Sequence, residues 1–302
     1  MKIRFRPHGL RIVGRGLIAL LALLWCCSCG VTHEKHAVVV DDHTSMNALD
    51  WSGTYTGTLP CADCAGIETS LTLSPARTYV LRSRYLDRQA VEDEFVHSGV
   101  FAWSRDGRSI ELMGIEGGRS RFQVGENRLF ALDQTGARIY GALAAAYTLT
   151  RSGAIAAADQ AEVVNLLSGP TWTLVELHGA ALAPQVAAPW VEFVTDGQRV
   201  SGFSGCNRFF GAYHTGADTP QAGAAMALTF DSMGATRMAC SPAAMRLESQ
   251  FLALLAQVAG WYLEPGNNVK EQNRSDDSVL VFVDSTQRVI ARCVADLNGA
   301  NG

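Results

Sequence analysis

Cys61 and Cys64, two cysteines three positions apart, are the residues whose spacing most directly suggests chemistry. They follow Pro60, so they can occupy the ends of a β-turn, where the Cα separation suits a disulfide. Three uses are open: a structural or redox-sensing disulfide, a Cu(I) site made of two soft thiolates in the reduced state, and a redox catalyst. We favour the disulfide. The catalyst has least support, because no strand-helix-strand unit surrounds the pair to lower a thiol pKa.

A second group of candidates lies beside two glycine-rich turns in the C-terminal half. We expect Cys206 and Cys240 to form a disulfide closing a loop of about 35 residues, which the chain-entropy model values at roughly 4 kcal/mol. The alternatives are a thiol or metal site with His214, or two unpaired buried cysteines. Four polar neighbours can either line a small-ligand or peptide cleft or cap backbone groups in the turns. These are Asn207, Arg208, Thr236 and Arg237.

Patterns of known enzyme chemistry are weak or absent. Ser204 lies in SGFSG, but it is displaced by one position from a nucleophile elbow, and no strand-to-helix turn surrounds it. The chain contains no phosphate-binding loop, HExxH motif or paired CxxC zinc ribbon. We therefore expect a protein that is not an enzyme and requires no cofactor, with copper as the metal that the cysteine pair would suit.

The first thirty residues have the layout of an export signal: a basic stretch, an apolar run and a cluster of small residues. The run from Leu17 to Trp25 has half of the ~20 residues needed to span a bilayer. Ser28 directly precedes Cys29, which makes Cys29 the best lipid acceptor. The alternative is cleavage elsewhere, which would leave ordinary thiols. We expect residues 1–28 to be removed as a lipoprotein signal peptide.

The small-residue cluster resembles the lipobox of bacterial lipoproteins, although Cys26 stands where that motif usually has leucine. Gly30, rather than aspartate, would be the second mature residue. The resemblance implies a lipid-anchored protein of the outer membrane that faces the periplasm.

Export changes the charge balance and the expected state of the cysteines. Without the five basic residues of the signal, 20 basic residues remain against 29 acidic ones, a net charge near −9. An acidic surface disfavours nucleic acid as a partner. An oxidising compartment favours disulfides, and the five remaining cysteines allow two pairs and one leftover. Cys293 lies in an apolar strand pattern, where a buried free thiol is the plain interpretation.

Residues 29–48 lack periodicity and are interpreted as a tether. Its histidines, His33, His36 and His43, could hold a metal ion, but solvated side chains are the favoured interpretation.

Residues 49–150 contain short runs of alternating hydrophobicity, among them 137–143 and 146–150, separated by turn residues. This pattern predicts an antiparallel sheet. So many short strands favour a small closed barrel, which removes exposed edges.

Residues 151–168 are interpreted as a linker with room for a helical turn or two. Strand patterns return after Gly169, and Ser241-Pro242 then supplies an N-cap and a first helical residue. The following segment, 243–261, is predicted to be a helix of about four turns with one apolar face. Residues 267–277 are predicted to be a loop. The sequence thus predicts a mainly β protein, with an α+β domain at 169–298 in which one main helix packs on a sheet. The predicted helix face consists of Leu247, Phe251, Leu254, Leu255 and Val258.

The segment YTGTLPCADCAGIE at 55–68 resembles the N-terminal domain of the NlpE family of copper-homeostasis and envelope-stress lipoproteins. Thr78-Tyr79-Val80, Gly125-Glu126-Asn127 and Leu132-Asp133 fit the same family. The resemblance covers nearly all of the first folded part. It implies a lipocalin-like β-barrel, a role in sensing envelope stress and a link to copper.

Residues 200–213 and 233–240, with Trp172-Thr-Leu174, resemble the META (HslJ-like) domain family over roughly 169–296. This second resemblance implies a fold but no activity.

Two functional hypotheses follow for the whole chain. One is a non-enzymatic envelope lipoprotein that reports stress or copper through contacts with an envelope signalling protein. The other is a periplasmic module that binds copper or a small apolar ligand for buffering or transport.

Replacing Cys29 by alanine is expected to leave the chain unlipidated and to remove it from the outer-membrane fraction, because no thiol remains at the position that directly follows Ser28. Cys27→Ala, in the same segment, should leave lipidation unchanged. Mass spectrometry of the mature N-terminus and membrane fractionation check both variants. Normal outer-membrane fractionation of Cys29→Ala would refute the assignment.

Overall fold

The computed structural model describes residues 43–87, 94–115, 119–183, 187–216, 224–231, 233–266 and 278–296. All of them belong to the unit Asp42–Gly302, which is distinct from Met1–Asp41. The predicted signal peptide, Cys29, His33, His36 and the predicted loop at 267–277 lie outside the described residues. Among the residues that are described, no helix is both long enough and apolar enough to span a membrane.

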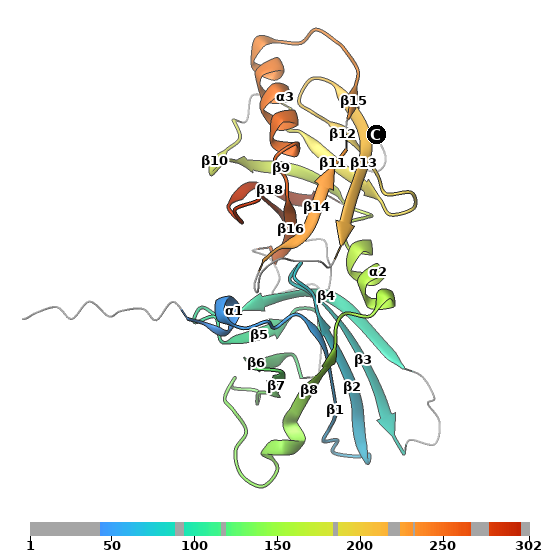
Figure 1. Cartoon of the computed structure of the whole chain (residues 1–302), viewed down its shortest axis with the longest axis vertical. Coiled ribbons are helices and arrows are strands. Elements are labelled where there is room, and N and C mark those ends of the chain that lie inside the picture. Colours follow the sequence, from blue (N-terminus) through green and yellow to red (C-terminus); the bar gives the residue numbers. More distant parts are fainter. Residues whose placement is uncertain are drawn as a thin grey trace, which may run out of the picture. The chain divides into compact units, whose positions relative to one another are not determined.

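Eight antiparallel strands in the first folded part form a closed barrel (Figure 1). Each strand pairs with the next one along the chain, and β8 pairs back to β1 through Thr54–Gly153, Tyr55–Arg151 and Thr56–Thr150. The predicted small antiparallel barrel is therefore confirmed. The strands are β1 Gly53–Leu59, β2 Gly66–Leu73, β3 Thr78–Leu86, β4 Phe95–Trp103, β5 Ser109–Leu112, β6 Arg121–Gly125, β7 Arg128–Ala131 and β8 Thr148–Gly153.

The alternation in the sequence becomes the inside and outside of this barrel. In β1, Tyr55 and Leu59 are buried, whereas Thr56 and Thr58 are exposed, as expected for a strand with one face in a core. The Tyr55 hydroxyl donates a hydrogen bond to the Trp51 carbonyl oxygen at 2.7 Å. Burial raises the pKa of Tyr55 to about 12. Buried side chains also alternate in β5, β6 and β7, whereas the first four residues of β3 are all buried, and Val80 belongs to the core cluster that contains Trp172 and Trp261.

Two segments of the first part differ from the prediction. Residues 137–143 form no strand: a single bridge joins Arg138 to Leu132, and a 3₁₀ helix, η1 (Ala144–Tyr147), follows. Gly136 and Gly141 have φ of 83° and 92°, backbone conformations that interrupt an extended chain. A short helix, α1 (Ser45–Ala48), forms in the segment interpreted as a tether, and the Met46 N–H donates to the Gly107 carbonyl at 3.0 Å.

The second sheet contains ten strands and also closes on itself, because β9 pairs with both β11 and β18. Its order is β9-β11-β12-β13-β14-β16-β17-β18, with β10 paired to β9 and β15 to β13. The predicted sheet with one main helix is confirmed, and closure is an additional finding. The strands are β9 Thr171–Leu177, β10 Ala180–Ala181, β11 Trp190–Val194, β12 Arg199–Phe203, β13 Arg208–Gly216, β14 Met226–Phe230, β15 Gly234–Ala235, β16 Gly260–Pro265, β17 Ser278–Val283 and β18 Val289–Asp296.

The main helix, α3 (Pro242–Leu255), begins as the sequence predicts, with the Ser241 hydroxyl accepting from the Ala244 N–H at 3.3 Å. All five residues of the predicted apolar face are buried. The helical prediction extended too far, however, because Gly260 and Trp261 lie in β16. There Trp261 pairs with Met226 of β14 and Phe282 of β17. The sheet needs this strand to close, so tertiary pairing overrides the local helical pattern.

Gly202 of β12 shows why the segment SGFSG is rich in glycine. A Cβ atom at this position would lie 2.1 Å from the Trp190 carbonyl oxygen and 2.6 Å from the Phe209 ring. The glycine is therefore required by the close approach of neighbouring strands. The motif is a packing feature of the sheet.

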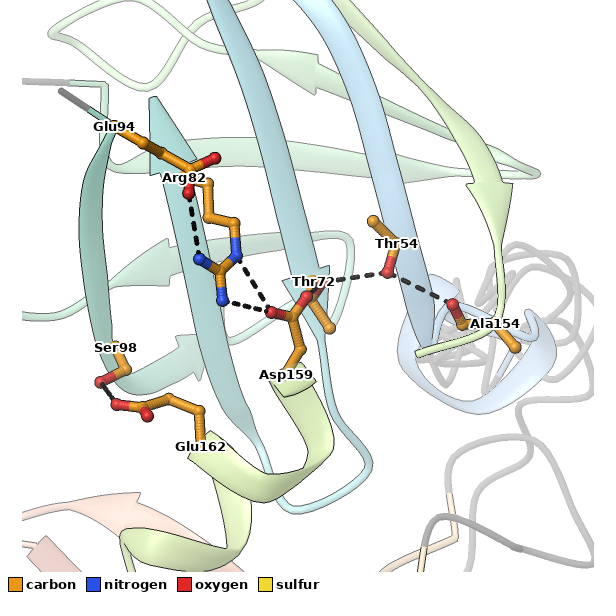
Figure 2. A network of polar contacts seen from close by, with 8 residues as sticks. All are labelled: Thr54, Thr72, Arg82, Glu94, Ser98, Ala154, Asp159 and Glu162. Carbon is orange, nitrogen blue, oxygen red and sulfur yellow. Dashed lines mark hydrogen bonds and ion pairs between the residues drawn. The ribbon is translucent and has the colours of Figure 1, made fainter. Parts of the chain in front are cut away.

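Helix α2 (Ala157–Asn165) lies in the segment interpreted as a linker and is fastened to the outer face of the first barrel (Figure 2). Asp159 is 5% exposed. Arg82 donates to its Oδ1 from Nε at 3.1 Å and from Nη2 at 2.9 Å, and the Thr72 hydroxyl donates to Oδ2 at 2.5 Å. The Ser98 hydroxyl donates to Glu162 at 3.0 Å. The helix thus satisfies its buried carboxylate entirely with side chains of β2 and β3.

The other side of α2 is apolar. Val163 and, just beyond the helix, Leu167 are buried in the core cluster that contains Trp172, Phe251 and Trp261. The Trp172 Nε1–H donates to the Leu167 carbonyl at 2.8 Å. The connecting segment is therefore held through an ion pair on one side and through apolar packing on the other.

Replacing Asp159 by alanine is expected to lower the free energy of unfolding by about 1–3 kcal/mol, because Arg82 and Thr72 lose a buried charged partner. Glu94 provides a matched control, since it binds the same arginine at 3.2 Å but is 52% exposed. Glu94→Ala should cost less than about 1 kcal/mol. Urea unfolding of the mature chain measures both values. Equal losses would show that burial of the Asp159 contact contributes nothing.

Candidate functional site

A disulfide joins Cys61 to Cys64, with an S–S distance of 2.07 Å and a Cα–Cα distance of 5.3 Å. Both residues lie in the loop between the end of β1 at Leu59 and the start of β2 at Gly66. Both are half-buried. The motif therefore lies at the rim of the first barrel, where solvent reaches it and where its position is set by the first hairpin.

The two sulfurs of this disulfide have different neighbours. Cys61 Sγ lies 3.3 Å from the Asp63 carboxylate, whereas Cys64 Sγ lies 3.3 Å from the Gly66 carbonyl oxygen. Among the described residues, these three side chains form the one group of at least three histidine, cysteine or acidic residues whose ligand atoms all lie within 4.8 Å of one another. Two thiolates would suit Cu(I), but only after reduction, because both sulfurs are engaged in the S–S bond.

A cavity of about 770 Å³ opens beside this loop. Its lining comes from one end of the barrel: the loop after β1, the start of β2, the end of β3, the start of β6, the segment after β7 and the helix η1. The walls carry guanidinium groups, phenol rings, carboxylates and a few aliphatic side chains, so the cavity is of mixed polarity. Cys61 is part of the lining and Cys64 is not. Its polar and aromatic lining residues include Asp63, Tyr85, Arg119, Arg121 and Tyr147.

Arg119 joins the two sides of the cavity. Its Nη2 donates to the Pro60 carbonyl at 3.3 Å, and its guanidinium lies 4.4 Å from the centre of the Tyr147 ring, a cation–π geometry. The neighbouring Arg121 instead forms an ion pair with Glu111 at 2.8 Å. The loop that carries the cysteines is thus tied to the helix η1 through Arg119.

The cysteine pair is recognisable from the sequence, but most of the groups around it are not. Asp63 could have been noticed from its place between the cysteines. Arg119 and Tyr147 carried no comparable signal, because Arg119 is 59 residues from Pro60 and only barrel closure brings them together. The cavity is therefore a property of the fold.

In the second part, a disulfide joins Cys206 to Cys240, with an S–S distance of 2.04 Å and a sequence separation of 34. Beside it, Asn207 is buried and its amide is fully used. Its Nδ2 donates to Glu248 at 3.0 Å, and its Oδ1 accepts from the Met238 N–H at 2.7 Å and from the Thr236 hydroxyl at 2.9 Å. These contacts favour capping of the turns over an open ligand cleft.

The remaining candidates of this region do not converge on one site. Arg208 is exposed, with its guanidinium 5.6 Å from the centre of the Trp190 ring, and Arg237 is also exposed. His214 pairs with Asp231 at 3.0 Å on the surface. Ser204 is buried and donates its hydroxyl hydrogen bond to the Asn207 carbonyl at 2.7 Å, so it supports the turn. Cys293 is a fully buried free thiol whose pKa is raised by burial.

Comparison with known families separates these two regions. The model of the NlpE N-terminal domain matches residues 55–142, and the model of the META domain matches residues 165–286. Residues 55–142 thus resemble the NlpE N-terminal domain and residues 165–286 resemble the META domain, and we refer to these two parts as the NlpE domain and the META domain. The NlpE domain contains the cysteine loop and most of the cavity lining. Tyr147 and strand β8, which closes the barrel, follow the matched residues.

Similar proteins cover parts of the chain. Lipoprotein NlpE of Escherichia coli (strain K12) is 36% identical over 119 residues, which are 39% of this chain and 49% of that protein. This chain therefore aligns with about half the length of that relative. A solved structure from Shewanella oneidensis is 46% identical and covers 36% of this chain and 96% of its own, with a TM-score of 0.32. The crystal structure of the Cpx pathway activator NlpE from Escherichia coli is 19% identical and covers 63% of this chain and 98% of its own, with a TM-score of 0.26.

Within the META domain, Asn207→Ala is expected to lower the free energy of unfolding by about 2–3 kcal/mol, because it leaves several buried partners without a hydrogen bond. Arg237→Ala should change it by less than about 0.5 kcal/mol, as is usual for an exposed side chain. Denaturant unfolding at one pH measures both. An Asn207→Ala variant with the wild-type free energy of unfolding would contradict the capping role. It would instead favour the interpretation of Asn207 as part of a ligand cleft.

Proposed function

We propose that this chain is a non-enzymatic lipoprotein of the bacterial envelope that reports envelope stress or copper through the Cys61–Cys64 pair of its NlpE domain. Lipidated Cys29 would hold it in the outer membrane, facing the periplasm. The observation that carries the proposal is the half-buried disulfide at the rim of the barrel. The similarity to Lipoprotein NlpE supports the envelope role, and the export segment supports the anchor.

The position of the disulfide makes a sensor mechanism physically reasonable. Its loop carries no core residue between Leu59 and Gly66, so the barrel core does not depend on the S–S bond. Reduction would free the loop to change shape while the fold persists. Such a change alters the surface around the cavity, which is where we place the contact with an envelope signalling protein.

Copper binding is the second candidate function, and the grouping of Cys61, Asp63 and Cys64 favours it. Reduction would supply two thiolates, and the carboxylate is close enough to complete the ligand set. This version makes the chain a buffer for Cu(I) in the periplasm. A small apolar ligand fits less well, because charged side chains line the cavity.

Replacing both Cys61 and Cys64 by serine tests the two candidates together. In cells, the double variant should stay lipidated but lose its effect on an envelope-stress reporter after exposure to copper or oxidant, because the redox-active bond is gone. In solution, the reduced wild-type protein should bind Cu(I) against a competing chelator at micromolar concentration, and the double variant should not.

His214→Ala serves as the control, since His214 is an exposed potential ligand on the META domain, and it should behave as wild type in both assays. An unchanged reporter response in the double variant would refute the sensor. Failure of the reduced wild-type protein to bind Cu(I) would refute the copper buffer alone.

A further inference from the structure

Only one of the two residues in the Cys61–Cys64 disulfide lines the cavity. Cys61 is part of the cavity lining, whereas Cys64 is outside it and packs against the Gly66 carbonyl oxygen at 3.3 Å. A molecule that enters the cavity therefore meets Cys61 first. Thiol–disulfide exchange depends on which sulfur is accessible to the attacking thiolate and which leaves. The geometry assigns Cys61 as the sulfur that the incoming thiolate attacks.

Electrostatics give the same assignment independently. The Asp63 carboxylate lies 3.3 Å from Cys61 Sγ, and a nearby negative charge disfavours a thiolate. If the bond breaks with Cys61 as the leaving group, a second negative charge forms beside Asp63. If it breaks with Cys64 as the leaving group, the charge forms on a sulfur that makes no such 3.3 Å contact with the carboxylate, although the Asp63 carboxylate lies within 4.8 Å of it. Attack at Cys61 with release of Cys64 is therefore favoured by both access and charge.

The cavity also offers a cation beside the cysteine loop. Among the residues that the structure describes, Arg119 contacts a backbone carbonyl and an aromatic ring rather than a carboxylate, so its charge can attract an anion. Arg121 is already paired with Glu111, and Asp133 accepts three hydrogen bonds within its own turn. Arg119 is thus the group best placed to hold a carboxylate of a bound ligand.

We propose that the cavity binds a low-molecular-weight thiol that carries a carboxylate, and that this thiol exchanges with the disulfide at Cys61. The volume of about 770 Å³ is in the range of small-molecule sites and too small for a folded oxidoreductase. Arg119 holds the carboxylate, and the ligand sulfur approaches Cys61 Sγ from inside the cavity. This inference rests on the proposed redox role of the cysteine pair and names the reductant class that sets its state.

The exchange balances in two steps. The ligand thiolate forms a bond to Cys61 Sγ as the Cys61–Cys64 bond breaks, and Cys64 leaves as a thiolate that takes up a proton from water. A second molecule of the same thiol attacks the ligand sulfur of the mixed disulfide and releases Cys61. The two cysteines gain two electrons and two protons, and two thiols become one small disulfide.

The test uses the full mature chain and three simple thiols of different charge: 3-mercaptopropionate, 2-mercaptoethanol and cysteamine. Exchange is run with iodoacetamide present, which alkylates the cysteine that is released first, and the products are mapped by mass spectrometry. We expect mercaptopropionate on Cys61 and the alkyl group on Cys64. An Asp63→Asn variant should show more of the reverse product, because the charge that disfavours the Cys61 thiolate is gone.

Charge selectivity tests the role of Arg119. Relative to wild type, Arg119→Met should slow exchange with 3-mercaptopropionate about threefold to tenfold, the range for loss of one partly exposed charge-assisted contact. The rate with 2-mercaptoethanol should be unchanged. Arg119→Lys should restore most of the rate. Arg128→Met, on an exposed arginine outside the cavity lining, should match wild type with every thiol.

Two results would overturn the inference. One is a mixed disulfide mainly on Cys64 in the wild-type protein. The other is an Arg119→Met variant that slows all three thiols equally, which would assign Arg119 a purely structural role. Either result leaves the sensor proposal intact, because another reductant could still set the redox state. An unchanged reporter response in the Cys61/Cys64 double variant would instead refute the sensor without affecting these exchange kinetics.

Discussion

The pairing of β1 with β8 is the constraint on which the NlpE domain depends. It converts eight strands that each contact their sequence neighbours into a barrel without a free edge. Arg151 reinforces this seam through the Asp50 carboxylate at 3.0 Å and the Ser52 carbonyl at 2.5 Å. The seam also determines the site, since β1 leads into the cysteine loop and β8 follows η1. An open sheet could keep the disulfide, but it would not keep Pro60 and Tyr147 on opposite sides of Arg119.

The elements that the sequence predicted well are those whose pattern is local. Period-two alternation identified the strands of the first barrel, and Ser241-Pro242 marked the start of α3 correctly. Two of the three failures have non-local causes, whereas the one at residues 137–143 is local. Gly260 and Trp261 continue a helical pattern but are taken into β16 by their partners in β14 and β17. Residues 137–143 alternate like a strand, yet two glycines turn the chain away from the sheet. The docking of α2 depends on Asp159 meeting Arg82, which lies on a strand 77 residues earlier.

For the candidate site, too, the local pattern was predictable from the sequence and the contacts made by the fold were not. The spacing of Cys61 and Cys64 is enough to place two sulfurs within bonding reach, and the structure has that bond. The difference between the two sulfurs could not be predicted, because it arises from a cavity wall and a side-chain orientation. For Asn207, the sequence left two roles open. From sequence it could line a cleft or cap a turn, and only its contacts with Thr236, Met238 and Glu248 distinguish the two roles.

The two disulfides also differ in what they enclose. The first spans a sequence separation of 3 and the second a separation of 34. A protease that cuts the backbone once between Cys206 and Cys240 would leave both fragments covalently joined, so the META domain could be nicked without losing either piece. The short bond in the NlpE domain gives almost no such protection to its barrel. The Cys206–Cys240 disulfide thus keeps its domain in one piece after a backbone cut. The Cys61–Cys64 disulfide can open and close without changing which parts of the chain are covalently connected.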